Sequence, residues 1–269
     1  KRGRYLASDA DITTHTLLYR KHYSKAVGIQ AEIYVYPRMT DVTEIVTVCE
    51  RMLGTIQCAR RLYEDPFAFR TVRDYTTDDP MKTINWKASA KTGSLMVNTF
   101  DSVRSQKVML FLDVEDTGIL KYEDLVEESI ALAATMMRRL MRQNIEVGFA
   151  LNKKDSEVFL PANNRGNRIV LERLLAEYDK EDGAEDFGQL VRRLFSDRFA
   201  NRPLAEDTLL VFVTKNLNGS LLKCIRECVG AYQTLVVVPA YRGEGGFSGD
   251  AAQKSRDNIQ VLVKEVGRT

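Results

Sequence analysis

The sequence is poor in the residues that build the commonest catalytic and metal centres. It has two histidines, His15 and His22, and neither lies near a cysteine or serine in a recognisable nucleophile motif, so histidine-assisted nucleophilic catalysis is not indicated. Four cysteines are scattered over 269 residues, which argues against a disulfide framework and favours a reducing compartment. Cys224 and Cys228 have the spacing of one helical face, but no second pair of ligands has zinc-type spacing, so we interpret them as helix-packing residues.

Long hydrophobic runs and an excess of one charge are also absent. No apolar run approaches the roughly 18 residues of a membrane-spanning helix, and no signal peptide precedes Lys1. The 39 basic and 37 acidic residues leave a net charge of +2, which argues against a nucleic-acid binder held by bulk electrostatics. The chain begins without methionine on a strand-like motif, so we expect it to be a soluble part of a longer protein.

From residue 105 onward the sequence contains an alternation of strand and helix patterns. Strands buried on both faces are indicated by apolar runs at 108–112, 147–151, 209–213 and 235–238. Helices are indicated by the patterns at 122–141, 169–178, 186–196 and 221–229. This order predicts an α/β fold, with an open, mostly parallel sheet and helices on both faces.

Two further elements complete this part of the prediction. Residues 157–160 indicate a short strand at an edge, and residues 258–265 indicate a final helix. The loop before that helix, 243–249, is rich in glycine. It lacks the lysine and the hydroxyl of a phosphate-binding P-loop, and its Glu244 would oppose an anion, so a nucleotide site is not indicated there.

The first 65 residues have a different character. Short alternating runs such as 29–36, closed by Pro37, indicate a small β-rich unit over residues 1–40. Residues 41–65 are compatible with two structures, because their β-branched residues favour strand whereas the spacing of the later apolar residues allows a helix. The sequence leaves both possibilities open.

The most unusual stretch is 73–100, which combines the only tryptophan with alternating charged, aromatic and small residues. We expect a turn at Asp78-Asp79-Pro80, then a short helix, then a strand over 95–100. We expect one side of this element to face the interior, with Ile84, Trp86 and Ala90. The other side would face solvent, with Lys82, Lys87 and Lys91. Trp86 would then be a buried anchor between the β-rich unit and the α/β region. Stacking on single-stranded nucleic acid is the weaker interpretation of one tryptophan in a near-neutral chain.

This stretch resembles the signature of the bacterial domain-of-unknown-function family 58. The matching positions are Arg73, Tyr75, Asp79, Lys82, Ile84, Trp86, Lys87, Ala88, Ala90, Thr92, Gly93 and Leu95. The resemblance extends upstream to 1–5 and 35–38 and downstream to Asp113. The family usually has glycine at position 78 and arginine at positions 82 and 91, so bidentate recognition by arginine is not carried over to those lysines. Members typically carry hydrophobic segments before this point, which implies membrane tethering through segments missing from this chain.

The ends of two predicted strands resemble a von Willebrand factor A domain, whose metal-ion-dependent adhesion site begins Asp-x-Ser-x-Ser and adds a threonine and an aspartate from later loops. Asp113 matches the first aspartate and Thr117 the last hydroxyl, whereas Glu115 replaces the middle serine. After Thr214, Lys215 stands where the resemblance places the later aspartate. A lysine there would repel a divalent ion and neutralise Asp113 or Glu115. We therefore expect a degenerate site without metal, and no cofactor.

Together these patterns predict three segments. A β-rich unit with an ambiguous tail covers residues 1–65, the signature segment covers 66–104, and a von Willebrand A-like, Rossmann-type α/β domain covers 105–269.

The resemblance implies a non-enzymatic protein-interaction module of a bacterial membrane-associated protein, on the cytoplasmic side of the cell membrane. Its implied partner is a MoxR-type AAA ATPase, in assembly, maturation or envelope stress. The predicted contact residues are Arg73, Tyr75, Asp79, Lys82, Trp86, Lys87, Lys91, Asp113, Glu115 and Asp116. Two alternatives remain open. One is a divalent-metal-dependent ligand binder that uses Asp113 and Thr117 despite Lys215, and the other is a hydrolase that uses strand-end carboxylates.

Overall fold

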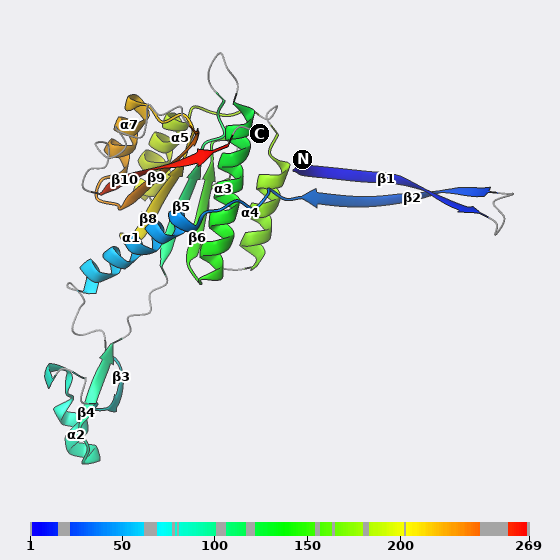
Figure 1. Ribbon diagram of the computed structural model, residues 1–269. Helices are drawn as coiled ribbons and strands as arrows, with labels where there is room; N and C mark the ends of the chain where they lie inside the picture. Colours follow the sequence, from blue (N-terminus) through cyan, green and yellow to red (C-terminus); the bar gives the residue numbers. More distant parts are fainter. Residues whose placement is uncertain are drawn as a thin grey trace.

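The computed structural model of the chain contains three β-sheets among the residues that it describes. The described residues are 2–15, 22–61, 69–76, 79, 81–100, 106–116, 122–153, 157–162, 165–179, 183–201, 203–242 and 258–267. A six-stranded sheet forms the centre of an α/β domain, and two two-stranded sheets accompany it (Figure 1).

The six-stranded sheet confirms the predicted open α/β architecture. Its strands are β5 (Lys107–Leu112), β6 (Glu146–Leu151), β7 (Phe159–Ala162), β8 (Thr208–Val213), β9 (Thr234–Tyr241) and β10 (Ile259–Val266). They lie in the order β10-β9-β8-β5-β6-β7, and only the short edge strand β7 runs antiparallel to its neighbour. The strand order reverses direction between β5 and β8, which is the topological switch point of a Rossmann-type sheet.

Three helices cover one face of this sheet (Figure 1). They are α1 (Thr43–Arg61), α3 (Glu123–Arg142) and α4 (Arg165–Glu177). Every second residue of β5, namely Val108, Leu110 and Leu112, packs in this layer with apolar residues of α1 and α3. The alternation follows from the strand period of two, which sends neighbouring side chains to opposite faces.

The opposite face is covered by α5 (Phe187–Arg193), a π-helical turn η3 (Leu194–Arg198), α6 (Phe199–Asn201) and α7 (Gly219–Val229). The intervening residues of β5, Met109 and Phe111, point into this layer. Phe111 stacks on Phe212 of β8, with ring centroids 4.5 Å apart. The predicted helices over 186–196 and 221–229 therefore lie where the hydrophobic patterns placed them.

Two segments needed the structure to be assigned. Within 41–65, residues 43–61 form the helix α1, and residues 62–65 lie outside the described residues. Val42 and the apolar side chains of α1 up to Leu53 belong to the same core as the central sheet. The final helix predicted over 258–265 is wrong, because this segment is the strand β10 paired in parallel with β9. Ile259, Val261 and Val263 recur with a period of two, with Gln260 and Leu262 between them, and these β-branched residues favour strand over helix. The glycine-rich loop at 243–249 lies outside the described residues.

The amino-terminal segment is an antiparallel ribbon of β1 (Gly3–His15) and β2 (His22–Val35), as the β-rich prediction required. In Figure 1 this ribbon extends away from the α/β domain, with its base beside α4. Arg2 anchors that base. Its guanidinium donates two hydrogen bonds to the carboxylate of Glu127, each 2.9 Å long, and others to the carbonyls of Leu175 and Tyr178.

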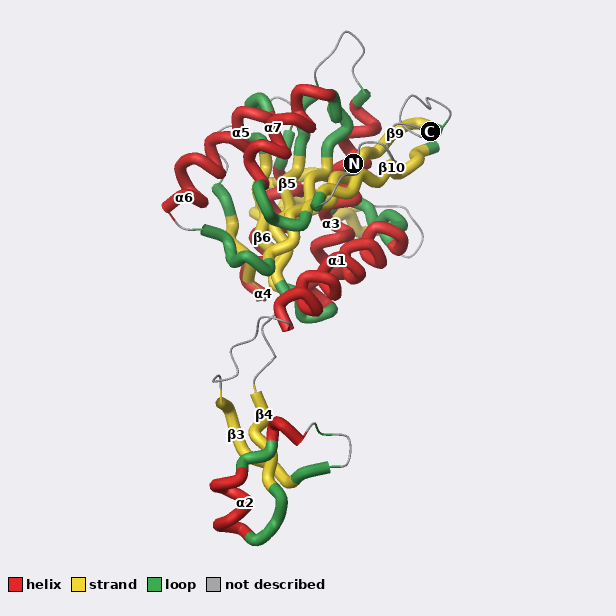
Figure 2. Tube along the Cα trace, turned by 90° about the vertical axis from the view of Figure 1, so that its left-hand side faces the viewer, coloured by secondary structure: helices red, strands yellow, loops and turns green. Residues whose placement is uncertain are grey.

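The signature segment forms a second small unit, shown in Figure 2. It consists of β3 (Phe69–Asp74), the 3-10 turn η1 (Met81–Thr83), α2 (Trp86–Thr92) and β4 (Met96–Phe100). Asn85 caps α2 by accepting a hydrogen bond from the backbone N–H of Ala88, and Gly93 ends the helix in the left-handed conformation at φ 77°. Ile84 and Val97 are the buried apolar pair of this unit.

The predicted burial of one α2 face is correct for Ile84 and wrong for Trp86 and Ala90. Trp86 is 64% exposed and Ala90 is also exposed. The small unit is too thin to cover both faces of α2, because Ile84 and Val97 already fill its interior. Trp86 is therefore not the buried anchor between two units that the sequence suggested.

Among the helices of the described residues, none is both long and apolar enough to cross a membrane.

Candidate functional site

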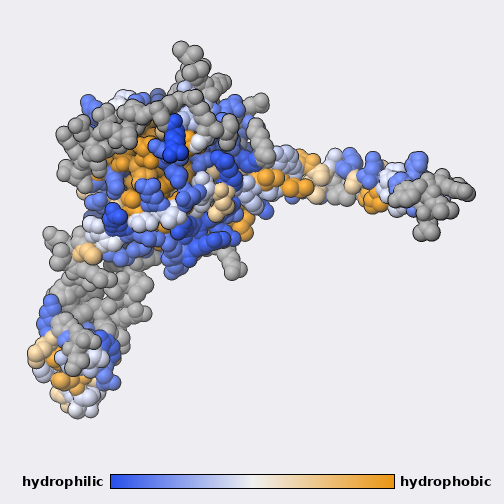
Figure 3. All heavy atoms as spheres, viewed as in Figure 1, coloured by the Kyte–Doolittle hydropathy of each residue, from blue (hydrophilic) through white to orange (hydrophobic). Residues whose placement is uncertain are grey.

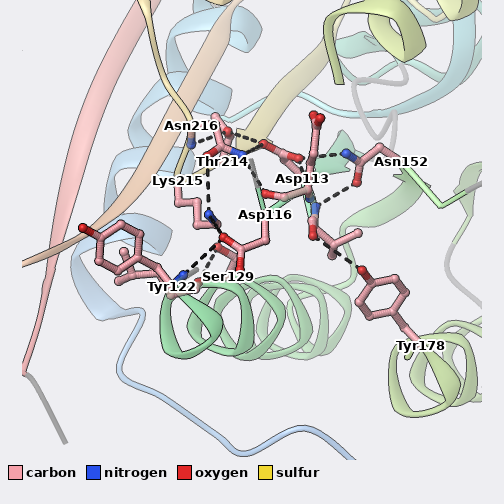
Figure 4. A network of polar contacts seen from close by, with 12 residues as sticks. Asp113, Asp116, Tyr122, Ser129, Asn152, Tyr178, Thr214, Lys215 and Asn216 are labelled. Atoms are coloured by element: carbon pink, nitrogen blue, oxygen red, sulfur yellow. Dashed lines mark hydrogen bonds and ion pairs between the residues drawn. The ribbon is translucent and has the colours of Figure 1, made fainter. Parts of the chain in front are cut away.

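A polar cluster lies at the carboxyl ends of β5, β6 and β8, at the switch point of the sheet (Figure 4). Asp113 follows β5, Asn152 follows β6, and Thr214 begins the segment after β8. All three side chains are essentially inaccessible to solvent. Parallel strands bring their carboxyl ends to one edge, which is where ligands of such sheets bind, so this is the first place to look for chemistry.

Asp113 accepts four hydrogen bonds from the protein itself. Its Oδ1 accepts from the backbone N–H of Glu115 at 2.9 Å and from Nδ2 of Asn152 at 2.8 Å. Its Oδ2 accepts from Oγ1 of Thr214 at 2.6 Å and from Nδ2 of Asn216 at 3.1 Å. Four donors around a side chain that is 1% exposed describe an ionised carboxylate with its lone pairs occupied.

The orientation of both amides is set by their other hydrogen bonds. Oδ1 of Asn152 accepts from the backbone N–H of Val114 at 2.8 Å, and its Nδ2 also donates to the carbonyl of Glu185. Nδ2 of Asn216 donates to the carbonyl of Glu115 at 2.7 Å. Each amide therefore turns its NH₂ group, and not its oxygen, toward Asp113.

Lys215 completes the cluster from the other side. Its side chain is 4% exposed, and its Nζ donates to Oδ1 of Asp116 at 2.5 Å. The same oxygen accepts from the backbone N–H of Tyr122, whose ring lies 6.0 Å from the ammonium. The sequence led us to expect that Lys215 neutralises Asp113 or Glu115, whereas its partner is Asp116.

Burial is the largest cause of a raised pKa at both central carboxylates, Asp113 and Glu115. Burial raises the pKa of Asp113, and the hydrogen bonds from Thr214, Glu115, Asn216 and Asn152 oppose that shift. Burial and then the negative charge of Asp113 raise the pKa of Glu115. Glu115 and Asp116 are only partly buried, so their carboxyls reach solvent, whereas Asp113 does not.

The donor set does not suit a divalent cation. A cation such as Mg²⁺ needs oxygen ligands, but the groups that face Asp113 are two amide NH₂ groups, a backbone N–H and a hydroxyl that donates. Lys215 adds a positive charge nearby. Thr117, the other predicted ligand, lies outside the described residues. Within those residues, no group of three or more histidine, cysteine, aspartate or glutamate side chains is placed to hold a metal.

Burial also corrects part of the predicted partner surface. Asp113 is inaccessible, so it cannot touch a partner directly. Asp116 is 20% exposed but is paired with Lys215, so Glu115 is the partly exposed carboxyl of the three strand-end residues that this lysine does not pair with.

In the signature unit, Arg73 and Asp79 bind each other. The guanidinium of Arg73 donates two hydrogen bonds to the carboxylate of Asp79, at 2.7 and 2.6 Å. Asp79 also accepts from the backbone N–H and the hydroxyl of Thr76. The bonds from Arg73 are the largest cause of a pKa of Asp79 well below its usual range. These two signature residues therefore fasten the end of β3 to the following turn.

The remaining signature residues lie at the surface of α2. Trp86 and Ala90 occupy one stripe of the helix, and Lys87 and Lys91 occupy the next, since residues four apart share a stripe. All four are exposed. We call these four residues the α2 surface. Lys82 is exposed next to it in sequence, and Tyr75 is half-buried.

Asn152 belongs to the strand-end cluster but was not among the residues that the sequence analysis named. It directly follows the apolar run of β6, as Asp113 follows β5. That position was its only signal.

The fold and the cluster define the chain as a Rossmann-type α/β protein whose switch point is closed by its own hydrogen bonds. Residues 71–232 match the family model described as "Protein of unknown function DUF58". Because this match spans more than half of the chain, the chain belongs to that family.

The chain is similar to a curated protein and to a solved structure, among others. The uncharacterised protein YeaD of Bacillus subtilis (strain 168) is 26% identical over 89 residues, which are 33% of this chain and 21% of that protein. The match therefore spans about a fifth of the relative's length. Among solved structures, proximal thread matrix protein 1 from the mussel byssus is 10% identical with a TM-score of 0.40, over 60% of this chain and 43% of that one.

Proposed function

We propose that this chain is a non-enzymatic protein-interaction module that binds its partner through the α2 surface. The observation that carries the proposal is the 64% exposure of the only tryptophan, beside two exposed lysines on a short, capped helix. Tryptophan is enriched at protein–protein interfaces and among the residues that contribute most to binding.

The strand-end cluster supports a binding role over catalysis. A general base or nucleophile needs an accessible group within reach of a substrate, whereas Asp113 has its lone pairs occupied and is buried. We propose that the α/β domain is von Willebrand A-like and that internal donors and Lys215 replace the metal. The domain then serves as a rigid body that carries the α2 surface.

The partner that fits the α2 surface has an acidic surface with an apolar recess for the indole of Trp86. From the family resemblance we propose that it is a MoxR-type AAA ATPase. The whole protein would be associated with a bacterial membrane, on the cytoplasmic side, and would act in assembly, maturation or envelope stress.

Trp86 reports directly on this proposal because it is the only tryptophan in the chain. The chain is titrated with a tryptophan-free variant of a purified MoxR-type ATPase from the same bacterium, so that all tryptophan fluorescence comes from Trp86. We expect its emission to shift to shorter wavelengths as the indole leaves water. Lys87→Glu is expected to weaken the complex about tenfold by removing charge complementarity.

The matched control is Lys223→Glu, the same charge reversal at an exposed lysine on α7. This variant is expected to bind as the unaltered chain does. The proposal is wrong if no shift occurs at saturating ATPase, or if the two reversals weaken binding equally.

A further inference from the structure

The β1–β2 ribbon has features that the proposed function does not use. In the part of the chain that the structure describes, each strand of the ribbon pairs only with the other, so neither outer edge is paired with a further strand. The base of the ribbon lies beside α4, where the guanidinium of Arg173 lies 4.9 Å from the ring centroid of Tyr34. Figure 3 shows apolar side chains along the ribbon. Its exposed large apolar residues include Leu6, Ile12 and Tyr23. An isolated two-stranded ribbon is marginally stable in water, and a long free edge is a template for another strand.

A bulge in β2 places two opposite charges on one face of the ribbon. Glu32 lies opposite Leu6, and Lys25 lies opposite Ile12. Leu6 and Ile12 are six residues apart on β1, which has no extra residue, so they share a face. Glu32 and Lys25 therefore also share that face, although in a regular strand a separation of seven residues would put them on opposite faces. The cause is the register shift between Ala7 and Asp9, where β2 contains one additional residue.

The outer edge of β2 is consequently complementary to itself. When two copies of β2 lie antiparallel around a two-fold axis between Gly28 and Ile29, Lys25 of each copy faces Glu32 of the other. The same register places Tyr23 opposite Tyr34 and Ala26 opposite Ala31. In a strand, residues whose side chains lie on one face direct their backbone N–H and C=O groups to the same edge. In this register, paired residues therefore have their side chains on the same face and their backbone groups in position to hydrogen-bond across the new strand pair.

We propose that two copies of this chain associate through their β2 edges and join the ribbons into a four-stranded antiparallel sheet. Residues 23–26 of one copy pair with residues 31–34 of the other. The two-fold axis repeats this contact, so one such segment lies on each side of the bulges. Opposite charges directly across a strand pair stabilise it, and an isologous contact with two-fold symmetry closes at the dimer. A lipid surface would leave the backbone groups of the edge without partners, which favours a strand as the occupant.

Sedimentation velocity on the whole chain tests this dimer. Lys25→Glu and Glu32→Lys each place like charges across the two-fold axis twice, and each is expected to weaken dimerisation about tenfold. In an equimolar mixture, a mixed dimer of the two variants again has opposite charges at both contacts between positions 25 and 32, so the mixture is expected to recover the dimer. Asp9→Lys on β1 changes charge equally, on the other strand and the other face, and is expected to dimerise as the unaltered chain does.

Circular dichroism checks that each variant is folded, which matters most for Glu32→Lys because Glu32 also pairs with Arg4 of its own copy. A chain that stays monomeric at high concentration, including one that instead cosediments with lipid vesicles, overturns the proposal. So does a mixture that stays as monomeric as the single variants. This result is independent of the ATPase titration, because the ribbon and the α2 surface share no residue.

Discussion

The strand-end cluster and the α2 surface use polar and charged side chains in opposite ways. In the cluster, every donor around Asp113 is turned inward and the carboxylate is closed to solvent. On the α2 surface, Trp86 and two lysines are turned outward and are exposed. A buried network that is fully satisfied fixes one conformation, whereas an exposed aromatic among like charges is suited to a partner. The comparison supports our proposal that the site which a Rossmann-type sheet normally offers for ligands is here a structural network.

The largest expected effect is on stability, from Asp113→Asn. This substitution keeps the shape of the side chain but places an NH₂ group against two of the four donors. We expect a loss of about 3 kcal/mol in the free energy of unfolding, because buried donors lose their acceptor. Urea unfolding followed by circular dichroism measures it, with Asp9→Asn on the exposed ribbon as the control. A loss no larger than that of the control would show that the cluster is not a structural network.

A smaller loss is expected from Lys215→Met. This variant removes a buried ammonium and leaves Asp116 with the backbone N–H of Tyr122. We expect a loss of about 2 kcal/mol, since one partner of a largely buried ion pair is left alone while Asp116 keeps some contact with water. Adding Asp116→Leu to Lys215→Met should recover part of the loss, and a double-mutant cycle measures the coupling. Additive losses would contradict the pairing of Lys215 with Asp116.

Glu115→Gln tests the electrostatics of the cluster through pH. The pKa of Glu115 is raised in the folded state from an ordinary value of 4.5, so the folded state holds a proton that the unfolded chain has released. Ionising Glu115 therefore costs stability, and that cost grows as pH rises above about 4.5. We expect Glu115→Gln to stabilise the protein at pH 7 by a few tenths of a kcal/mol, because solvent screens a partly exposed group.

Thermal unfolding at several pH values measures this gain for Glu115→Gln, which should disappear below the ordinary pKa. A gain that is the same at pH 3 and pH 7 would exclude the electrostatic cause.

The smallest effect on global stability is expected from Asp79→Asn. The hydrogen bonds from Arg73 lower the pKa of Asp79 in the folded state. They therefore stabilise the signature unit at pH values above the ordinary aspartate pKa, and this stabilisation is lost as the pH falls through the lowered pKa of the folded state. The variant should leave the unfolding of the α/β domain unchanged. Hydrogen exchange should become faster at the amides of β3 and β4, and unchanged exchange there would show that the pair fastens nothing.

Much of this fold was predictable because its signals are local. Continuous apolar runs marked β5, β6, β8 and β9, since buried parallel strands need apolar side chains on both faces. The family signature was also readable from the sequence and agrees with the family match over residues 71–232.

The errors fell where tertiary packing decides the outcome. The segment of β10 was assigned to a helix, and α1 was left undecided, because short apolar segments fit both periods until a neighbouring element is known. Trp86 is exposed because the small signature unit offers few side chains that could cover its indole. The donors around Asp113 come from three different strand ends, so their convergence needed the sheet order.

The comparison of the two regions is tested most directly by one binding measurement on two variants. The affinity of the MoxR-type ATPase is measured for Lys87→Glu and for Asp113→Asn, at a temperature where both are folded. Our account predicts that Lys87→Glu weakens binding about tenfold while Asp113→Asn leaves the affinity unchanged. Unchanged binding by Lys87→Glu together with lost binding by Asp113→Asn would contradict it, and would place the functional site at the strand ends.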